Sequence, residues 1–130
     1  MGLSLIASLL GALGGAVLIG GVILLVFRLT GMEVPRFAVL WKAAFFAQAA
    51  VIVADTFGAP LMPGAAGTLV VLMVGLIGAF IAYDRILETP EGRPMGRKAA
   101  ALALGAHSVF SILSFLLLVP PLLRAFGIPA

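Results

Sequence analysis

The chain has no cysteine and one histidine, and only 10% of its 130 residues are charged. The lack of cysteine excludes disulfides, thiolate metal sites and cysteine nucleophiles. Soluble domains carry about 25% charged residues. With so little charge and 63% hydrophobic residues, a chain of this size cannot hide its apolar surface in one core. Much of that surface is therefore expected to face lipid or other subunits.

The formal charge of +3 does not indicate a nucleic-acid-binding protein, because the basic residues flank long apolar runs. In that position Lys and Arg act as topology signals and contact lipid headgroups. Seven of the eight basic residues have this role: Arg28, Arg36, Lys42, Arg85, Arg93, Arg97 and Lys98. We therefore expect a lipid bilayer, and no nucleic acid, among the partners.

Four apolar runs predict four membrane-spanning helices within a single domain of residues 1–130, at about residues 2–27, 37–57, 67–83 and 99–119. Helices are expected because lipid offers no partner to an exposed backbone amide. The last run is expected to stop at Pro120-Pro121, since proline does not continue a regular helix. The predicted fold is an all-α integral membrane protein, an up-down bundle of four transmembrane helices.

The basic residues also predict the orientation. They concentrate in residues 28–36 and 84–98, two connections that lie on the same side of an up-down bundle, and Lys42 can snorkel to that side. The positive-inside rule makes these connections cytoplasmic and places both termini on the non-cytoplasmic side. A multi-pass protein of a bacterial inner membrane is the expected localisation.

The opposite connection, residues 56–66, contains no charged side chain. Such a loop is unusual in water. Two interpretations remain open: a short loop in the headgroup layer, or an apolar segment that docks into a partner.

Small residues at spacing four on the first and third runs predict close helix packing. They are Ala7, Gly11, Gly15, Gly75, Gly78, Ala79 and Ala82. We favour packing within the bundle over packing against other membrane subunits.

Polar side chains inside the spans define a predicted intramembrane seam between the second and fourth helices: Gln48, His107, Ser111 and Ser114. His107 and the two serines share one helix face. A rise of about 1.5 Å per residue places Gln48 and His107 at similar depth, so we expect them to lie close together.

On the non-cytoplasmic side, Asp55 and Arg124 are the two charges of opposite sign. An unpaired carboxylate next to hydrocarbon is costly, so an ion pair between them is expected. The alternative for Asp55 is a carboxylate that carries an ion or a proton, but its position close to an interface favours the structural role.

His107 is the only histidine, so it must carry any histidine-based chemistry; no metal site is expected unless a haem or another pigment is bound at His107. The segment from Ala103 to His107 resembles the AxxxH element of light-harvesting polypeptides, which would imply a tetrapyrrole at His107. Those polypeptides have a single span. We favour a histidine that is hydrogen-bonded to Gln48 or Ser111, with no cofactor.

The sequence does not predict an enzyme, because no carboxylate pair, nucleophile with base, or metal cluster stands in a span. We expect a small non-catalytic accessory subunit of a larger inner-membrane complex, for which an energy-transducing complex is one candidate. The alternative is a small homo-oligomeric transporter or channel whose polar path includes Gln48, Asp55, His107 and Ser111. Pigment or haem binding through His107 is a third hypothesis.

Overall fold

The computed structural model describes residues 2–129, which is the predicted domain without its first and last residues. These residues form four helices: α1 (Gly2–Leu29), α2 (Phe37–Gly58), α3 (Gly64–Ile86) and α4 (Arg97–Ala125). Each helix is long and apolar enough to cross a membrane. The prediction of an all-helical protein with four candidate membrane spans is confirmed.

The helices have 22 to 29 residues, which corresponds to about 33 to 44 Å at 1.5 Å per residue. The hydrocarbon layer is about 30 Å thick. α2 and α3 exceed it by less than one turn, whereas α1 and α4 are long enough to tilt or protrude.

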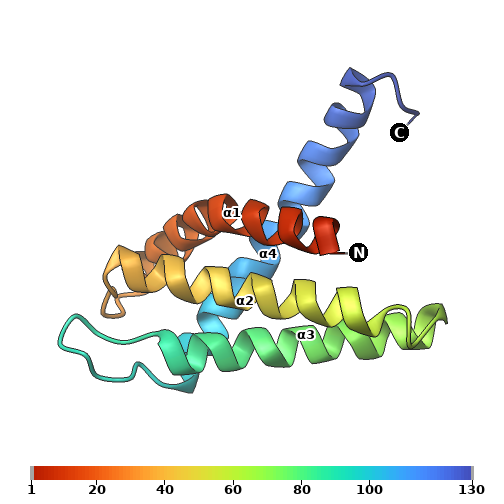
Figure 1. Cartoon of the computed structure of the whole chain (residues 1–130). Helices are drawn as coiled ribbons and strands as arrows, with labels where there is room; N and C mark the ends of the chain where they lie inside the picture. The colour runs from red at the N-terminus through yellow and green to blue at the C-terminus, as the bar shows by residue number, and fades with distance from the viewer. Residues whose placement is uncertain (1, 130) are drawn as a thin grey trace.

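The first three helices lie side by side, and each runs opposite to the one before it (Figure 1). α2 packs against α1 and α3, and α4 makes smaller interfaces with the same two helices. α2 and α4 are therefore diagonal neighbours rather than a packed pair. The most buried side chains of the bundle come from the halves of the four helices next to the 30–36 and 87–96 connections.

Small residues bring α2 and α3 together. A Cβ added to Gly75 would lie 3.2 Å from the Cα of Val51, so the two backbones approach more closely there than larger side chains allow. Gly78 faces Ala50 in the same interface, and Ala79 is fully buried. Dispersion between such close surfaces drives helix association where lipid removes the hydrophobic driving force.

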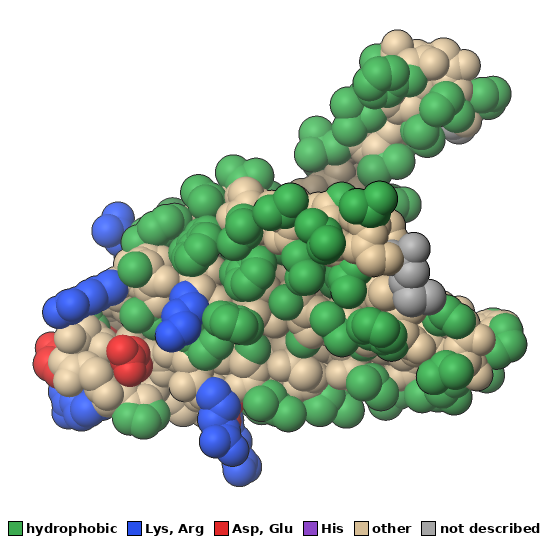
Figure 2. Space-filling model, viewed as in Figure 1, with side chains coloured by type: hydrophobic (Ala, Val, Ile, Leu, Met, Phe, Trp, Pro, Cys, Tyr) green, Lys and Arg blue, Asp and Glu red, His purple; other side chains and the backbone are tan. Residues whose placement is uncertain are grey.

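The second half of α4 leaves the bundle. It projects away from the other three helices and carries the C-terminus with it (Figure 1). Its exposed large side chains include Ile112, Leu113, Phe115, Leu116, Leu117, Leu118 and Leu122. The visible face of this projecting segment carries apolar side chains (Figure 2). Phe110 still packs against the core, and Ser111 and Ile112 face the other helices, so we call residues 113–125 the projecting segment.

Most helix ends differ from the sequence prediction, and the differences at α2, α3 and the end of α4 change the connections. α3 is three residues longer at each end than the predicted 67–83, and α2 ends at Gly58, so the predicted loop 56–66 shortens to residues 59–63. α4 continues through Pro120 and Pro121 to Ala125. The two prolines remove the N–H groups that would bond the carbonyls of residues 116 and 117. The helix nevertheless continues for one more turn, which closes with a bond from the Phe126 N–H to the Leu122 carbonyl (3.2 Å).

Charged side chains gather at the end of the bundle that holds the 30–36 and 87–96 connections (Figure 2). The longer connection is a short hairpin with an antiparallel bridge between Glu88 and Pro94. The Thr89 N–H donates to the Arg93 carbonyl, and the Gly92 N–H donates to the Thr89 carbonyl, both at 2.8 Å. Side chains of the two connections line one small hollow, so the connections lie side by side.

Candidate functional site

His107 is buried, and its ring lies against Tyr83 of α3. The Tyr83 hydroxyl and the His107 Nδ1 are 2.6 Å apart, and the two rings meet edge to face with centroids 5.9 Å apart. Within residues 2–129 the Tyr83 hydroxyl has no other partner. We therefore assign the phenol as donor and Nδ1 as acceptor, which satisfies both groups. In that tautomer Nε2 carries the proton and can donate to another group.

Sequence reasoning missed Tyr83. The expected partners of His107 were Gln48 and Ser111, but the hydrogen bond goes to the tyrosine. Tyr83 is the one tyrosine of the chain and the last aromatic residue of α3, a position typical of the aromatic residues at membrane interfaces. The role of Tyr83 could therefore not be read from the sequence, because nothing in the sequence shows that its side chain points toward α4.

The Gln48 side chain extends from α2 toward α1. A Cβ added to Gly15 would lie 3.2 Å from the Gln48 Nε2, so the glycine of α1 makes room for the amide. The Gln48 Oε1 is buried and has no hydrogen-bond partner in the described part of the chain. A second contact holds the same two helices together: the Trp41 Nε1–H of α2 donates to the Leu13 carbonyl of α1 at 3.0 Å. Between α1 and α2, the Trp41 side chain is thus hydrogen-bonded, whereas the Gln48 Oε1 is left without a donor among residues 2–129.

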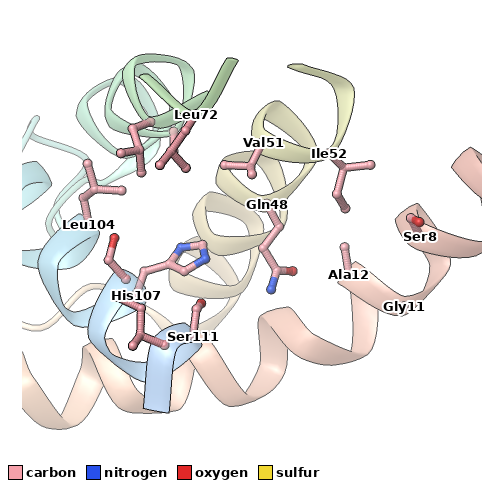
Figure 3. Close-up of a pocket in the computed structure, with 14 residues that line it drawn as sticks. Ser8, Gly11, Ala12, Gln48, Val51, Ile52, Leu72, Leu104, His107 and Ser111 are labelled. Atoms are coloured by element: carbon pink, nitrogen blue, oxygen red, sulfur yellow. The ribbon is translucent and has the colours of Figure 1, made fainter. Parts of the chain in front are cut away.

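A cavity of about 570 Å³ separates Gln48 from His107. All four helices line it, with the residues Ser8, Gly11, Ala12, Gln48, Val51, Ile52, Leu72, Leu76, Ala79, Leu104, His107, Ser108, Ser111 and Ile112. In Figure 3 the Gln48 amide and the His107 ring extend into the same space from α2 and α4. Ser8, Gly11, Ser111 and Ile112 are exposed, so the cavity is open along the side where the projecting segment leaves the bundle.

The predicted seam is thus brought together in part. Gln48, His107 and Ser111 line one cavity, whereas Ser114 is not among its lining residues. α2 and α4 stand on opposite sides of this cavity and do not pack directly, because the large residues of α4 after His107 turn away from the bundle. Ser8 of α1 also lines the cavity; it was not predicted, because it lies among apolar and small residues of the first run.

The expected ion pair between Asp55 and Arg124 does not form. Both residues are exposed, and the one ion pair among residues 2–129 joins Arg93 to Glu91 at 4.0 Å in the hairpin. Arg124 lies at the end of the projecting segment, which explains its separation from the α2 terminus. Asp55 does not line the cavity either.

The predicted small-residue faces divide into two groups. Gly15, Gly75, Gly78 and Ala79 face other helices, and Ala82 is half-buried against the core. Ala7 is exposed, and a Cβ added to Gly11 would meet no atom within 4 Å. The seven basic residues predicted to contact lipid headgroups are all exposed: Arg28, Arg36, Lys42, Arg85, Arg93, Arg97 and Lys98.

The small residue of the AxxxH element faces the helical core rather than an open space. Ala103, one turn before His107, is fully buried in the helical core, so protein atoms occupy the space beside it. No cluster of three metal-ligating side chains occurs in the described residues. What the site offers chemically is hydrogen bonding: a donor at His107, an amide at Gln48, and serine hydroxyls at one open edge.

Comparisons with protein-family models, with curated proteins and with solved structures give no match to this chain.

Proposed function

We propose that this protein is a small non-catalytic subunit of a larger membrane complex, and that the projecting segment attaches it to neighbouring helices. The observation that carries the proposal is the contrast between the packed first half of α4 and the uncovered second half. The buried residues of α4 all precede Ser108: they are Ala99, Ala100, Ala103 and His107.

The projecting arrangement has an energetic cost. A helix that leaves its own bundle gives up dispersion contacts that a compact bundle would make. In lipid such contacts, and not burial from water, hold helices together. A neighbouring chain that packs on the projecting segment would restore them. Apolar side chains around the segment suit this role.

We also propose how the chain is oriented in the membrane and which membrane holds it. The charged end of the bundle would lie in the cytoplasm of a bacterium, with residues 28–36 and 84–98 at that surface and both termini across the inner membrane. The clustering of charged side chains at one end supports this orientation. An energy-transducing complex is one candidate for the assembly. The short apolar connection, residues 59–63, lies at the opposite end and can add to the contact.

The test is the native mass of the protein after mild extraction from its own membrane. We expect the chain to migrate with a much larger assembly. Replacing Leu117 in the projecting segment with Asn should release the chain from that assembly. The matched control is Ile77→Asn on α3, which is similarly exposed on a packed helix (57% against 68%). A chain that migrates alone, with or without the substitution, would contradict the proposal.

A second candidate function is transport by a homo-oligomer, and the cavity lined by Gln48, His107 and Ser111 favours it. A dimer or tetramer of this chain alone that carries a solute flux in liposomes would support transport and overturn the accessory role.

A further inference from the structure

The cavity between the four helices has the size and the lining of a binding site. Small-molecule sites are typically concave, mostly apolar, and about 300–1,000 Å³ in volume, with a few polar groups that orient the ligand. This cavity, of about 570 Å³, has walls of Val51, Ile52, Leu72, Leu76 and Leu104 beside the polar side chains already described. It belongs to the part of the bundle that the compact helical core does not fill.

The charge of the lining restricts the ligand. None of the lining residues is Lys, Arg, Asp or Glu. A charged ligand group would therefore stand in an apolar space without a counter-ion, and this costs several kcal/mol per ion. The ligand that fits is neutral. The same argument disfavours phosphate and carboxylate headgroups.

The hydrogen-bonding groups restrict the ligand further. The buried Gln48 Oε1 lacks a donor, and a buried acceptor without a partner is costly. Once the Tyr83 hydroxyl donates to Nδ1, the His107 Nε2–H has no acceptor among residues 2–129. A hydroxyl group supplies both, because it donates one hydrogen bond and accepts others.

We propose that this cavity binds a neutral, membrane-soluble molecule with a hydroxyl group at one end of an apolar body. The hydroxyl lies beside the His107 ring and accepts from Nε2–H. The Gln48 Oε1 is covered by protein atoms in this structure, so the amide must turn from Gly15 into the cavity to accept a hydrogen bond from the hydroxyl. The apolar body lies along the aliphatic walls and leaves through the open side next to the projecting segment. This site does not depend on the accessory role proposed above, because the cavity is formed by one chain.

The test uses three probes with the same chain length: 1-dodecanol, dodecane and laurate. Radiolabelled probe is titrated onto the full chain in nanodiscs, and empty nanodiscs correct for partition into lipid. We expect saturable binding of one dodecanol per chain, with dodecane and laurate at least about tenfold weaker, the ratio that one lost or unpaired buried polar contact can produce. 4-Octylphenol then distinguishes a phenol from an aliphatic alcohol as the source of the hydroxyl, and saturable binding of either one supports the site.

Two variants on one helix make the test specific to the cavity. Gly11 lines the cavity and Gly14 does not, and a Cβ added at either position meets no atom within 4 Å. Gly11→Leu should fill the cavity and lower the affinity for dodecanol at least about tenfold, whereas Gly14→Leu should leave it unchanged. Gln48→Leu should weaken dodecanol binding and leave dodecane binding unchanged.

Three results would overturn the proposal. The first is that dodecane or laurate binds as tightly as dodecanol. The second is that Gly11→Leu and Gly14→Leu bind dodecanol with equal affinity. The third is that neither dodecanol nor 4-octylphenol shows saturable binding to the unaltered chain. Far-UV circular dichroism of each variant shows whether the helices remain intact. Because the Gly11 and Gly14 variants enter open space, loss of fold does not explain a difference between them.

Discussion

The two halves of α4 have opposite compositions and opposite surroundings. The first half is rich in alanine, and Ala99, Ala100 and Ala103 are fully buried against the other helices. The second half is rich in leucine and phenylalanine, and nearly all of its large side chains are exposed. Small side chains permit close packing between helices in lipid. Within one continuous helix, side-chain size therefore separates a segment that belongs to the bundle from one that does not.

A position in the packed half should react most strongly to added volume. Ala103→Leu places three extra carbons in a fully buried position, and overpacking of this kind lowers the free energy of unfolding by about 1–3 kcal/mol. Ala101→Leu on the exposed side of the same turn should change it by less than about 0.5 kcal/mol. Denaturation in mixed micelles measures both, and equal losses would show that α4 does not pack as described.

The hydrogen bond between α3 and α4 should come next. Tyr83→Phe removes the donor and leaves the buried His107 Nδ1 without a partner, which costs about 1–3 kcal/mol of unfolding free energy. The double variant Tyr83→Phe/His107→Phe should lose less than the two single losses added together, because replacing both polar partners removes the unpaired group. Additive losses in the same denaturation assay would mean that the two side chains are independent.

Truncation in the two halves of α4 should have unequal effects. Leu102 is half-buried against the core, and Leu102→Ala should cost about 1 kcal/mol, since a partly buried leucine loses only part of its packing. Leu116→Ala in the isolated chain should cost less than about 0.5 kcal/mol, because this side chain is exposed. Thermal unfolding of the purified protein compares the two variants. A larger loss at Leu116 would contradict the exposed position of the projecting segment.

The smallest effect is expected at the terminal charge. Arg124→Gln should leave the unfolding free energy within about 0.5 kcal/mol of the original, because Arg124 is exposed and makes no ion pair within residues 2–129. Arg93→Gln, in the exposed pair with Glu91, provides the comparison. If Arg124→Gln alone clearly lowered the unfolding free energy, the result would support the ion pair with Asp55 that the sequence predicted.

Much of the fold could be predicted from the sequence, and the reason is physical. Lipid requires a hydrogen-bonded backbone and about 20 apolar residues per span, so each apolar run indicated its helix. The prolines at 120 and 121 gave a wrong helix end, because near the end of a helix their missing N–H groups remove few bonds. The ends of α3 were also underestimated: Asp84 and Arg85 interrupt the apolar run at one end, and the small residues 64–66 next to Pro63 resemble a loop at the other.

The site was less predictable. The helix period placed His107 and Ser111 on one face, and depth arguments placed Gln48 opposite, and the three residues do line one cavity. The direction of α4 was not visible in the sequence, however, since both halves are apolar. The bond between Tyr83 and His107 follows from that direction, because α4 packs on α3 only along its first half.

The most direct test of the central claim is a photo-crosslinking scan along α4 in native membranes. A photoreactive amino acid replaces each residue from 113 to 122 in turn, beyond the positions that face the bundle or its cavity. Lipid would cover all sides of the segment equally, whereas a packed partner would cover one side. The account predicts adducts with another protein chain of constant mass, recurring every three or four residues. Adducts with lipid alone at every position, or adducts with other helices of the same chain, would contradict it.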